Sequence, residues 1–427
     1  MIQRIRAFRN GKHRADRFPE FQGNRHAREW IGGFLVLGVL VGLLGSLLIA
    51  WQYHIDSNPQ LIGLHFLALN AGYVLAVAFA QRIVLRISPR ALALLACGIA
   101  FASLIALSFV VPPAPALWRM LCLASIGFAG GCLATALLYA LEPYFSQAPA
   151  AVANLAGILF GSGCLITTLM VGITYFAGSV QIETALLAIV PLLYLIMLAN
   201  SKFSAALAPV RSSPEENRIR ETLHDLRSVA AVLFGLLLFF QFGNESAIAG
   251  WLPLFLIHRL GANPVWAVFA LGMYFLALML GRVAARPILA RVNHRRLLTA
   301  SILTAMAGYL LLSFATWMPA AWTAVVIIGA GFAPIYPLIA ETLDDRFSYH
   351  PGFYNGIFSV AITGAMFAPW LLGYVDEYLG IQYVMLVPAF GSVAVLILAL
   401  LIMFEAHLMG TSRDATVKAR AAAAGED

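Results

Sequence analysis

One acidic residue, Glu245, lies inside a long apolar stretch of the sequence. The stretch runs from about 228 to 257, long enough to cross a bilayer, and Glu245 falls near its middle with no Lys or Arg in the same stretch. A carboxylate at that depth costs at least about 2.5–3.5 kcal/mol, so it should face the protein interior or a watery cavity. Glu245 could therefore carry a proton or accept a hydrogen bond from a solute. The alternative is a permanently neutral carboxyl that joins its helix to a neighbour.

The composition places the chain in a membrane. The sequence has 427 residues, of which 61% are hydrophobic and 11% are charged. Soluble proteins carry about 25% charged residues, so this chain is predicted to be a polytopic membrane protein. Its net charge of +7 comes from basic residues between apolar stretches, a pattern typical of loops facing anionic lipid. No nucleic-acid-binding module, nucleophile–base pair, metal-ligand cluster or phosphate-binding loop is recognisable, so we expect no nucleic-acid partner, no enzymatic activity and no cofactor.

The sequence contains twelve apolar stretches, six on each side of a polar segment at 201–227. These stretches are predicted to form the helices that hold Glu245 and any other functional side chains in place. The first six lie near 31–51, 61–80, 91–111, 117–141, 150–174 and 182–200. The second six lie near 228–257, 264–287, 297–317, 320–341, 354–374 and 381–405. This pattern predicts an all-α integral membrane protein with two six-helix bundles, at 31–200 and 228–405. Polar tails at 1–30 and 406–427 flank them.

The basic residues predict the orientation. With the N-terminus inside the cell, the inner segments hold 25 of the 27 Lys and Arg residues, and only Arg119 and Arg259 lie elsewhere. By the positive-inside rule both termini and the 201–227 segment are cytoplasmic. This assignment puts Arg282 in an inner loop at 282–296, so no cation is expected beside Glu245 within the membrane.

The 201–227 segment has a local helix signal. Ser213, Pro214, Glu215 and Glu216 form a capping box with Pro at the first helical position. The apolar residues that follow recur at helical spacing, which predicts a short amphipathic helix on the inner membrane surface. A disordered linker is the alternative, because the segment is short and heavily charged.

The two halves contain a repeat. Glycines and an asparagine in the fifth stretch recur in the eleventh at an offset of 201, and a glycine of the fourth recurs in the tenth at an offset of 202. The pairs are Asn154 and Asn355, Gly163 and Gly364, Gly172 and Gly373, and Gly127 and Gly329. A parallel six-plus-six repeat is typical of alternating-access transporters, whose site lies near the midplane between the halves.

Together these features resemble the major facilitator superfamily over residues 30–405. Gly281-Arg282, followed by further arginines, resembles the signature loop after the eighth span of that family, whereas the loop after the second span lacks the family's aspartate. The run from Gln241 to Trp251 is similar to the seventh span of the fucose/glucose permease-like branch. Gly331, Pro334 and Pro337 are similar to its tenth span, where the prolines could bend the helix.

The resemblance implies which side chains face a central cavity. The predicted proton-coupling residue is Glu245, and the predicted solute-binding residues are Gln241, Asn244, Glu245, Trp251, Asn154, Tyr336 and Asn355. Amides in such positions can bind sugar hydroxyls, or they can simply join helices at a gain of about 0.6 kcal/mol. His65, in the outer part of the second span, could titrate near neutral pH or be a packed side chain.

The sequence as a whole predicts a monomeric secondary transporter in the inner membrane. A small polar organic solute, with sugars as the first guess, would move by alternating access with proton coupling. Its partners would be this small-molecule substrate, the proton and the lipid bilayer. A proton-coupled exporter of drug-like compounds is the alternative with the same fold. A non-transporting membrane sensor is the alternative of another class, but the tails are too short to hold a signalling domain.

Overall fold

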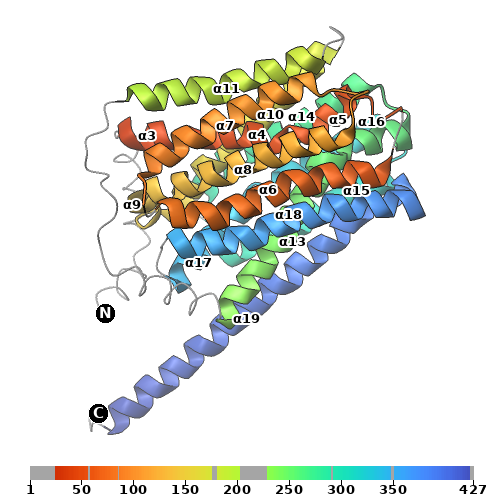
Figure 1. Cartoon of the computed structure of the whole chain (residues 1–427). Helices are drawn as coiled ribbons and strands as arrows, with labels where there is room; N and C mark the ends of the chain where they lie inside the picture. The colour runs from red at the N-terminus through yellow and green to blue at the C-terminus, as the bar shows by residue number, and fades with distance from the viewer. Residues whose placement is uncertain are drawn as a thin grey trace.

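The computed structural model describes residues 25–55, 58–84, 86–175, 180–201, 228–289, 292–347 and 351–423. Every element in these ranges is a helix (Figure 1). Eleven helices are long and apolar enough to cross a membrane, or twelve if the bent first pair is one span. The predicted all-α membrane fold is therefore confirmed. The tail at 1–24 and the predicted amphipathic helix of the linker lie outside the described residues.

The N-terminal half contains six spans. The first is broken into α3 (Arg25–Ile31), α4 (Gly33–Gly42) and α5 (Leu44–Ala50), with a bend of 42° before α5. The others are α6 (Pro59–Val84), α7 (Pro89–Phe109), α8 (Ala116–Ala140), α10 (Pro149–Thr174) and α11 (Val180–Asn200), with the short α9 (Glu142–Phe145) between α8 and α10.

The C-terminal half repeats this plan. It contains α13 (Val229–Leu260), α14 (Pro264–Leu289), α15 (His294–Phe314), α16 (Met318–Phe332), α17 (Ile335–Arg346), α18 (Pro351–Leu379), the 3-10 turn η3 (Ile381–Tyr383) and α19 (Leu386–Ala423). The tenth span breaks between α16 and α17 beside Pro334, one of the prolines expected to bend it. The last helix continues beyond residue 405, and Figure 1 shows α19 projecting from the bundle.

Apolar side chains on the outer faces explain why these helices suit a bilayer. On α11, Ile182, Ile189, Leu193 and Ile196 recur at helical spacing, and between 44% and 60% of each side chain is exposed. Exposure of such an apolar face to water would be unfavourable, whereas the hydrocarbon chains of a bilayer solvate it. The opposite face of α11 buries Leu187, Ala188 and similar residues in the bundle.

Glycines bring the helix backbones together in the same way in both halves. A Cβ added to Gly163 would lie 2.1 Å from the Leu35 carbonyl oxygen, so the fifth span touches the first. A Cβ added to Gly364 would lie 1.9 Å from the Phe239 carbonyl oxygen, so the eleventh span touches the seventh. The offset found in the sequence therefore corresponds to the same packing position in each bundle. Gly127 packs equally closely, on α6.

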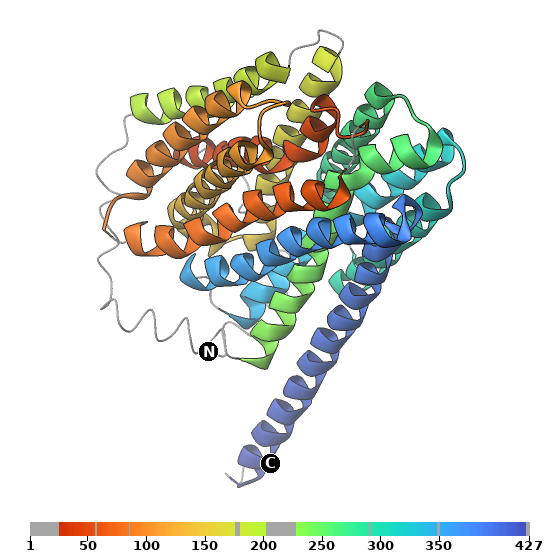
Figure 2. The ribbon, with the colours of Figure 1, turned by 45° about the vertical axis from the view of Figure 1, so that its right-hand side comes forward.

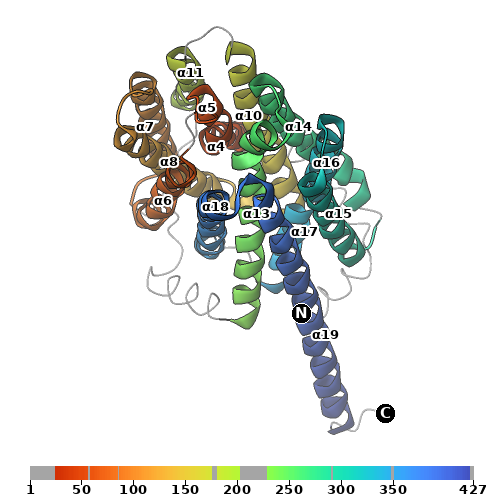
Figure 3. The same ribbon diagram turned by 90° about the vertical axis from the view of Figure 1, so that its right-hand side faces the viewer.

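Two pairs of spans make the most extensive contacts between the halves. Helix α6 runs beside α18, and α10 runs beside α14 (Figures 2 and 3). We call the side on which α11 ends and α13 begins the linker side, and the opposite side the distal side. Toward the distal side the halves meet at glycines: a Cβ on Gly63 would lie 2.9 Å from the Trp370 carbonyl oxygen, and a Cβ on Gly373 would lie 2.4 Å from that of Pro59.

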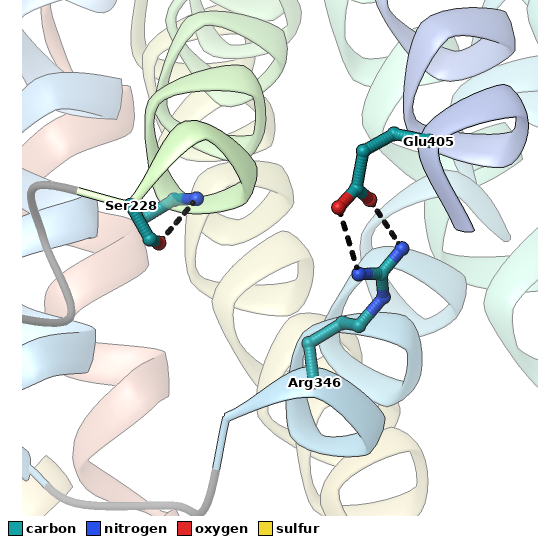
Figure 4. Close-up of polar contacts among 4 residues, drawn as sticks. Ser228, Arg346 and Glu405 are labelled. Carbon is teal, nitrogen blue, oxygen red and sulfur yellow. Dashed lines mark hydrogen bonds and ion pairs between the residues drawn. The ribbon is translucent and has the colours of Figure 1, made fainter. Parts of the chain in front are cut away.

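The linker side is held by polar contacts. Gln81 on α6 donates from its amide nitrogen to the Gly352 carbonyl oxygen of α18, at 3.4 Å. Within the C-terminal half, the guanidinium of Arg346 forms a two-pronged ion pair with the carboxylate of Glu405 (Figure 4). This pair fixes the end of α17 to α19. Ser228 caps the start of α13 nearby, accepting a hydrogen bond from the Ala231 backbone NH.

Candidate functional site

A cavity of about 170 Å³ lies between the two halves. Both halves supply its walls, from α4, α5, α6, α8, α9 and α10 on one side and α13, α14, α17 and α18 on the other. Its lining extends toward the linker side as far as Phe145 on α9 and Asn355 in the second turn of α18. A central site between two repeats is where transporters of this architecture bind their solutes.

Glu245 lines the cavity from the middle of α13. It shares a face of this helix with Phe242, Ser246 and Ala249, which are also lining residues. The amide nitrogen of Gln241, one helical turn earlier, donates to the Glu245 Oε1 atom at 2.8 Å. The other carboxyl oxygen receives no hydrogen bond from the part of the protein that the structure describes, so Glu245 retains an acceptor for a proton or a solute.

Arg282 is the residue that sequence reasoning missed. Its side chain is only 4% exposed and lines the same cavity from α14, which continues to Leu289. Arg282 lies inside the stretch Pro264–Ala285, which is long and apolar enough to cross a membrane. The expectation that no cation shares the membrane interior with Glu245 was therefore wrong. The helix length was the signal that could have placed Arg282 correctly.

The guanidinium of Arg282 reaches across to the other half. Its Nη1 atom donates to the Gly157 carbonyl oxygen of α10 at 2.5 Å. A Cβ on Gly157 would lie 2.7 Å from Nη1 and 2.8 Å from Cζ, so the guanidinium occupies space that only glycine leaves open. Asn154, one turn earlier, donates from Nδ2 to the Arg282 carbonyl oxygen at 3.1 Å. Among the described residues no hydrogen-bond partner is found for the buried Nε atom.

Glu245 and Arg282 act on each other electrostatically without touching. Arg282 lies close enough to Glu245 for its charge to act on the carboxyl, but no ion pair joins the two among the described residues. Inside a protein the effective dielectric is far below that of water, so a charge interaction over such a gap remains substantial. The cavity thus contains one basic and one acidic group with space between them.

The rest of the lining is mostly aromatic and apolar. Tyr336 stands against Phe242 and Phe358 with ring centroids 6.2 and 5.8 Å away, and these rings form one wall. Tyr274 and Asn355 also line the cavity, and neither the Tyr274 hydroxyl nor the Asn355 amide nitrogen has a hydrogen-bond partner within the described chain. Such a site presents a few polar groups on an apolar surface, as small-molecule sites do.

The structure separates the predicted solute-binding residues into two groups. Glu245, Tyr336 and Asn355 line the cavity, and Gln241 contacts it through Glu245. Trp251 is fully buried and donates from Nε1 to the Pro369 carbonyl oxygen at 3.0 Å, within the C-terminal half. Asn244 lies against Ser392 of α19.

Asn154 and Asn355, which the repeat relates, are both buried at the junction of the halves. Their side chains are 3% and 1% exposed, and neither faces lipid. Asn355 borders the cavity, whereas Asn154 binds the backbone of α14 beside it. The two residues therefore occupy related positions but have different partners.

His65 is part of a packed cluster away from the cavity. Its Nδ1 atom lies 2.7 Å from the Leu61 carbonyl oxygen, and its Nε2 atom lies 3.4 Å from the Tyr53 hydroxyl. Arg119 donates to the same hydroxyl at 3.1 Å and lies over the Trp51 ring. These contacts join the turn after α5 to α6 and α8, a role that fits the packed-side-chain alternative for His65.

The family model of the Major Facilitator Superfamily matches residues 30–363, which is well over half of the chain. The chain belongs to the major facilitator superfamily. Its members are transporters, and the resemblance found in the sequence is confirmed. No curated protein sequence matches the chain.

Solved structures of other facilitators share this fold. FucP, the fucose:proton symporter of E. coli, aligns in its outward conformation with 19% identity and a TM-score of 0.64 over 88% of this chain and 98% of that one. The nucleoside transporter NupG aligns with 14% identity and a TM-score of 0.68, over 89% and 99%. A D-xylose–proton symporter aligns with 14% identity and a TM-score of 0.71, over 88% and 95%. At these identities the likeness shows the fold alone.

Proposed function

We propose that this facilitator is a proton-coupled secondary transporter of a small polar organic solute. The observation that carries the proposal is the cavity between the two repeats, bordered by a membrane-embedded carboxyl at Glu245. Ionisable residues at this depth are costly and usually mark a substrate or proton pathway. The FucP and D-xylose carriers, which share the fold, are described as proton symporters, and this supports the same coupling here.

Glu245 is suited to load and release a proton as the cavity changes its access. A buried carboxyl favours its neutral form when the cavity is dry and ionises more readily when water enters. Gln241 supports the carboxyl at one oxygen and leaves the other free to exchange its proton. The positive charge of Arg282 near the carboxyl favours the ionised form and so opposes the effect of burial.

The size of the cavity favours a small solute. Pockets that hold drug-sized ligands enclose roughly 300–1,000 Å³, whereas this cavity encloses about 170 Å³. A drug exporter would need a larger site, so that alternative is less well supported. Hydroxyl and amide groups on aromatic walls suit a sugar-like molecule, which is the first class to test.

Transport into proteoliposomes tests the proposal. A solute is first found by screening for ligands that raise the thermal stability of the purified protein; a hundredfold excess over the dissociation constant contributes about 2.7 kcal/mol. Its accumulation is then measured with and without a pH gradient. Wild type should concentrate the solute when a gradient is imposed, and Glu245→Gln should bind and exchange it without concentrating it.

Glu183→Gln is the matched control. Glu183 is a second buried carboxyl, 1% exposed in the first turn of α11, and it does not line the cavity. Its substitution should leave gradient-driven accumulation intact. Equal accumulation by wild type and Glu245→Gln would show that Glu245 is not the coupling residue. A wild-type protein that only equilibrates the solute would show facilitated diffusion.

A further inference from the structure

We propose that the transported solute carries one negative charge, which Arg282 binds, and that it enters the cavity together with the proton on Glu245. This inference rests on the proposed transport function and narrows its substrate class from polar solutes to monoanions such as carboxylates. It follows from three features of the cavity: its unpartnered donors, the geometry of the arginine and the sum of its charges.

Three hydrogen-bond donors on residues of the cavity wall have no partner in the part of the chain that the structure describes. The Nε atom of Arg282, the hydroxyl of Tyr274 and the amide nitrogen of Asn355 are all buried, and none has a partner among the described residues. All three side chains line the same cavity. Because a buried donor without an acceptor costs free energy, this arrangement is expected where a ligand supplies the acceptor atoms. An oxyanion supplies several at once.

Arg282 is held in a way that leaves the Nε–H on one edge of its guanidinium without a protein partner among the described residues. Nη1 is bound to the Gly157 carbonyl oxygen, which fixes the plane of the group against α10. Nε, on the other edge, has no protein partner in the described chain. A guanidinium is planar and matches a carboxylate with paired N–H donors, which makes arginine better suited than lysine to this task.

The net charge of the cavity couples binding of the anion to protonation of Glu245. The titratable groups that face Glu245 are Cys164 from α10, Tyr274 and Arg282 from α14, Tyr309 from α15 and Tyr336 from α17. The thiol and the phenols are neutral at physiological pH, and from α6 only Tyr73 borders the cavity as a further titratable group. The charges of Arg282 and of ionised Glu245 therefore sum to zero.

Protonation of Glu245 leaves a net charge of +1, which a bound monoanion cancels. Proton and anion therefore favour each other's binding, and this linkage must be reciprocal. The loaded cavity holds cationic Arg282, neutral Glu245 and the anion, while the empty cavity holds cationic Arg282 and anionic Glu245. Both are neutral, so neither step of the cycle moves net charge. A neutral solute taken up with a proton would instead leave the loaded cavity positive.

Binding of matched acids and neutral analogues to the full-length purified protein tests the anion site. The probes are D-glucuronate with D-glucose, D-gluconate with D-sorbitol, and L-lactate with L-lactamide, each at an acidic and an alkaline pH. At least one acid should bind wild type about tenfold tighter than its neutral partner, more tightly at the acidic pH. If no acid exceeds its partner, the inference is overturned, whether or not the neutral compounds bind.

Arg282→Gln should abolish the preference for the acid, and Arg282→Lys should weaken it while keeping the charge. The control is Arg119→Gln, which removes another buried arginine, 5% exposed and outside the cavity, and should keep the preference. A preference that survives in Arg282→Gln overturns the assignment. If Arg282→Gln fails to fold, Arg282→Lys is compared with wild type instead. An unchanged preference of Arg282→Lys for the acid would contradict binding through the paired N–H donors of the guanidinium.

Transport separates this inference from the proposed function. The acid that binds should accumulate under a pH gradient at a rate unchanged by a membrane potential set with potassium and valinomycin. Accumulation of neutral compounds that depends on the potential would overturn the inference while the proposed function stands. Binding of the acid at Arg282 without accumulation would overturn the proposed function while the anion site stands.

Discussion

The Arg282 guanidinium donates to the Gly157 carbonyl oxygen and so joins the eighth span to the fifth across the two halves. This contact lies on the part of the cavity wall that extends toward the linker side. Asn154 adds a second cross-half hydrogen bond one turn away. Because the halves of an alternating-access carrier must separate on one side at a time, a contact of this kind has to break in each cycle.

Gly157→Ala should change transport more than it changes stability. The new Cβ would lie 2.7 to 3.0 Å from the guanidinium, which is the flexible end of a long side chain and can move aside. We expect the hydrogen bond to the carbonyl to weaken and the apparent solute affinity to change several-fold, measured as KM and kcat in proteoliposomes. Gly161→Ala is the control, since its Cβ would meet only the Met279 Cβ, at 3.9 Å. Equal effects of the two variants would argue against a role of the contact.

Gly163→Ala and Gly364→Ala should destabilise the protein to a similar extent. In each case the Cβ would collide with a backbone carbonyl of the first helix of its own half, at 2.1 and 1.9 Å. Backbones cannot move aside as a side chain can, so a loss of at least about 1–3 kcal/mol is expected. Thermal unfolding in detergent measures it. The control, Gly235→Ala, meets Val360 at an ordinary 3.6 Å and should be close to neutral. A neutral Gly163→Ala would contradict the close packing.

Trp251→Phe should lower stability and leave solute binding unchanged. The substitution removes the hydrogen bond to the Pro369 carbonyl oxygen, at a cost of about 0.5–1.5 kcal/mol. Trp251 was predicted to bind solute, yet it is fully buried away from the cavity. Thermal melts and the solute dissociation constant, compared with wild type, distinguish the two roles. A markedly weaker affinity at preserved stability would restore Trp251 to the site.

The orientation in the membrane remains a prediction from the distribution of basic residues. Pro113→Cys and Met318→Cys, each made in a protein without the four native cysteines, should react with an impermeant thiol reagent from outside intact cells. A cysteine in the 201–227 segment should react only after the membrane is permeabilised. Labelling of that segment from outside would refute both the charge argument and the cytoplasmic placement of the termini.

Hydropathy predicted the fold because a bilayer imposes long apolar helices on the sequence. Offsets between recurring glycines predicted the repeat, since Gly163 and Gly364 meet the same steric demand in each half. Arg282 was missed because it begins a run of arginines at the end of its span, so charge counting assigned it to a loop. Its depth depends on how far α14 continues past it, which the charge pattern does not encode.

Within α13, helical rotation separates residues that are neighbours in the sequence. Each residue turns about 100° around the axis, so Ser246 and Ala249 share the face of Glu245, whereas Asn244 and Trp251 do not. The resemblance to the permease branch suggested Asn244 and Trp251 together with Glu245, and the periodicity of the helix would have excluded these two. Partners such as Gly157 come from another half and cannot be read from α13 at all.

The two ends of the carrier are closed by different kinds of contact, and this has a kinetic consequence. Toward the distal side, backbone meets backbone at Gly63 and Gly373, whereas the linker side relies on hydrogen bonds from Gln81, Asn154 and Arg282. Water can replace hydrogen bonds as they break, but it cannot replace close apolar packing at equal cost. The unloaded carrier should therefore rest with its cavity turned to the linker side, and reorientation toward the distal side should limit turnover.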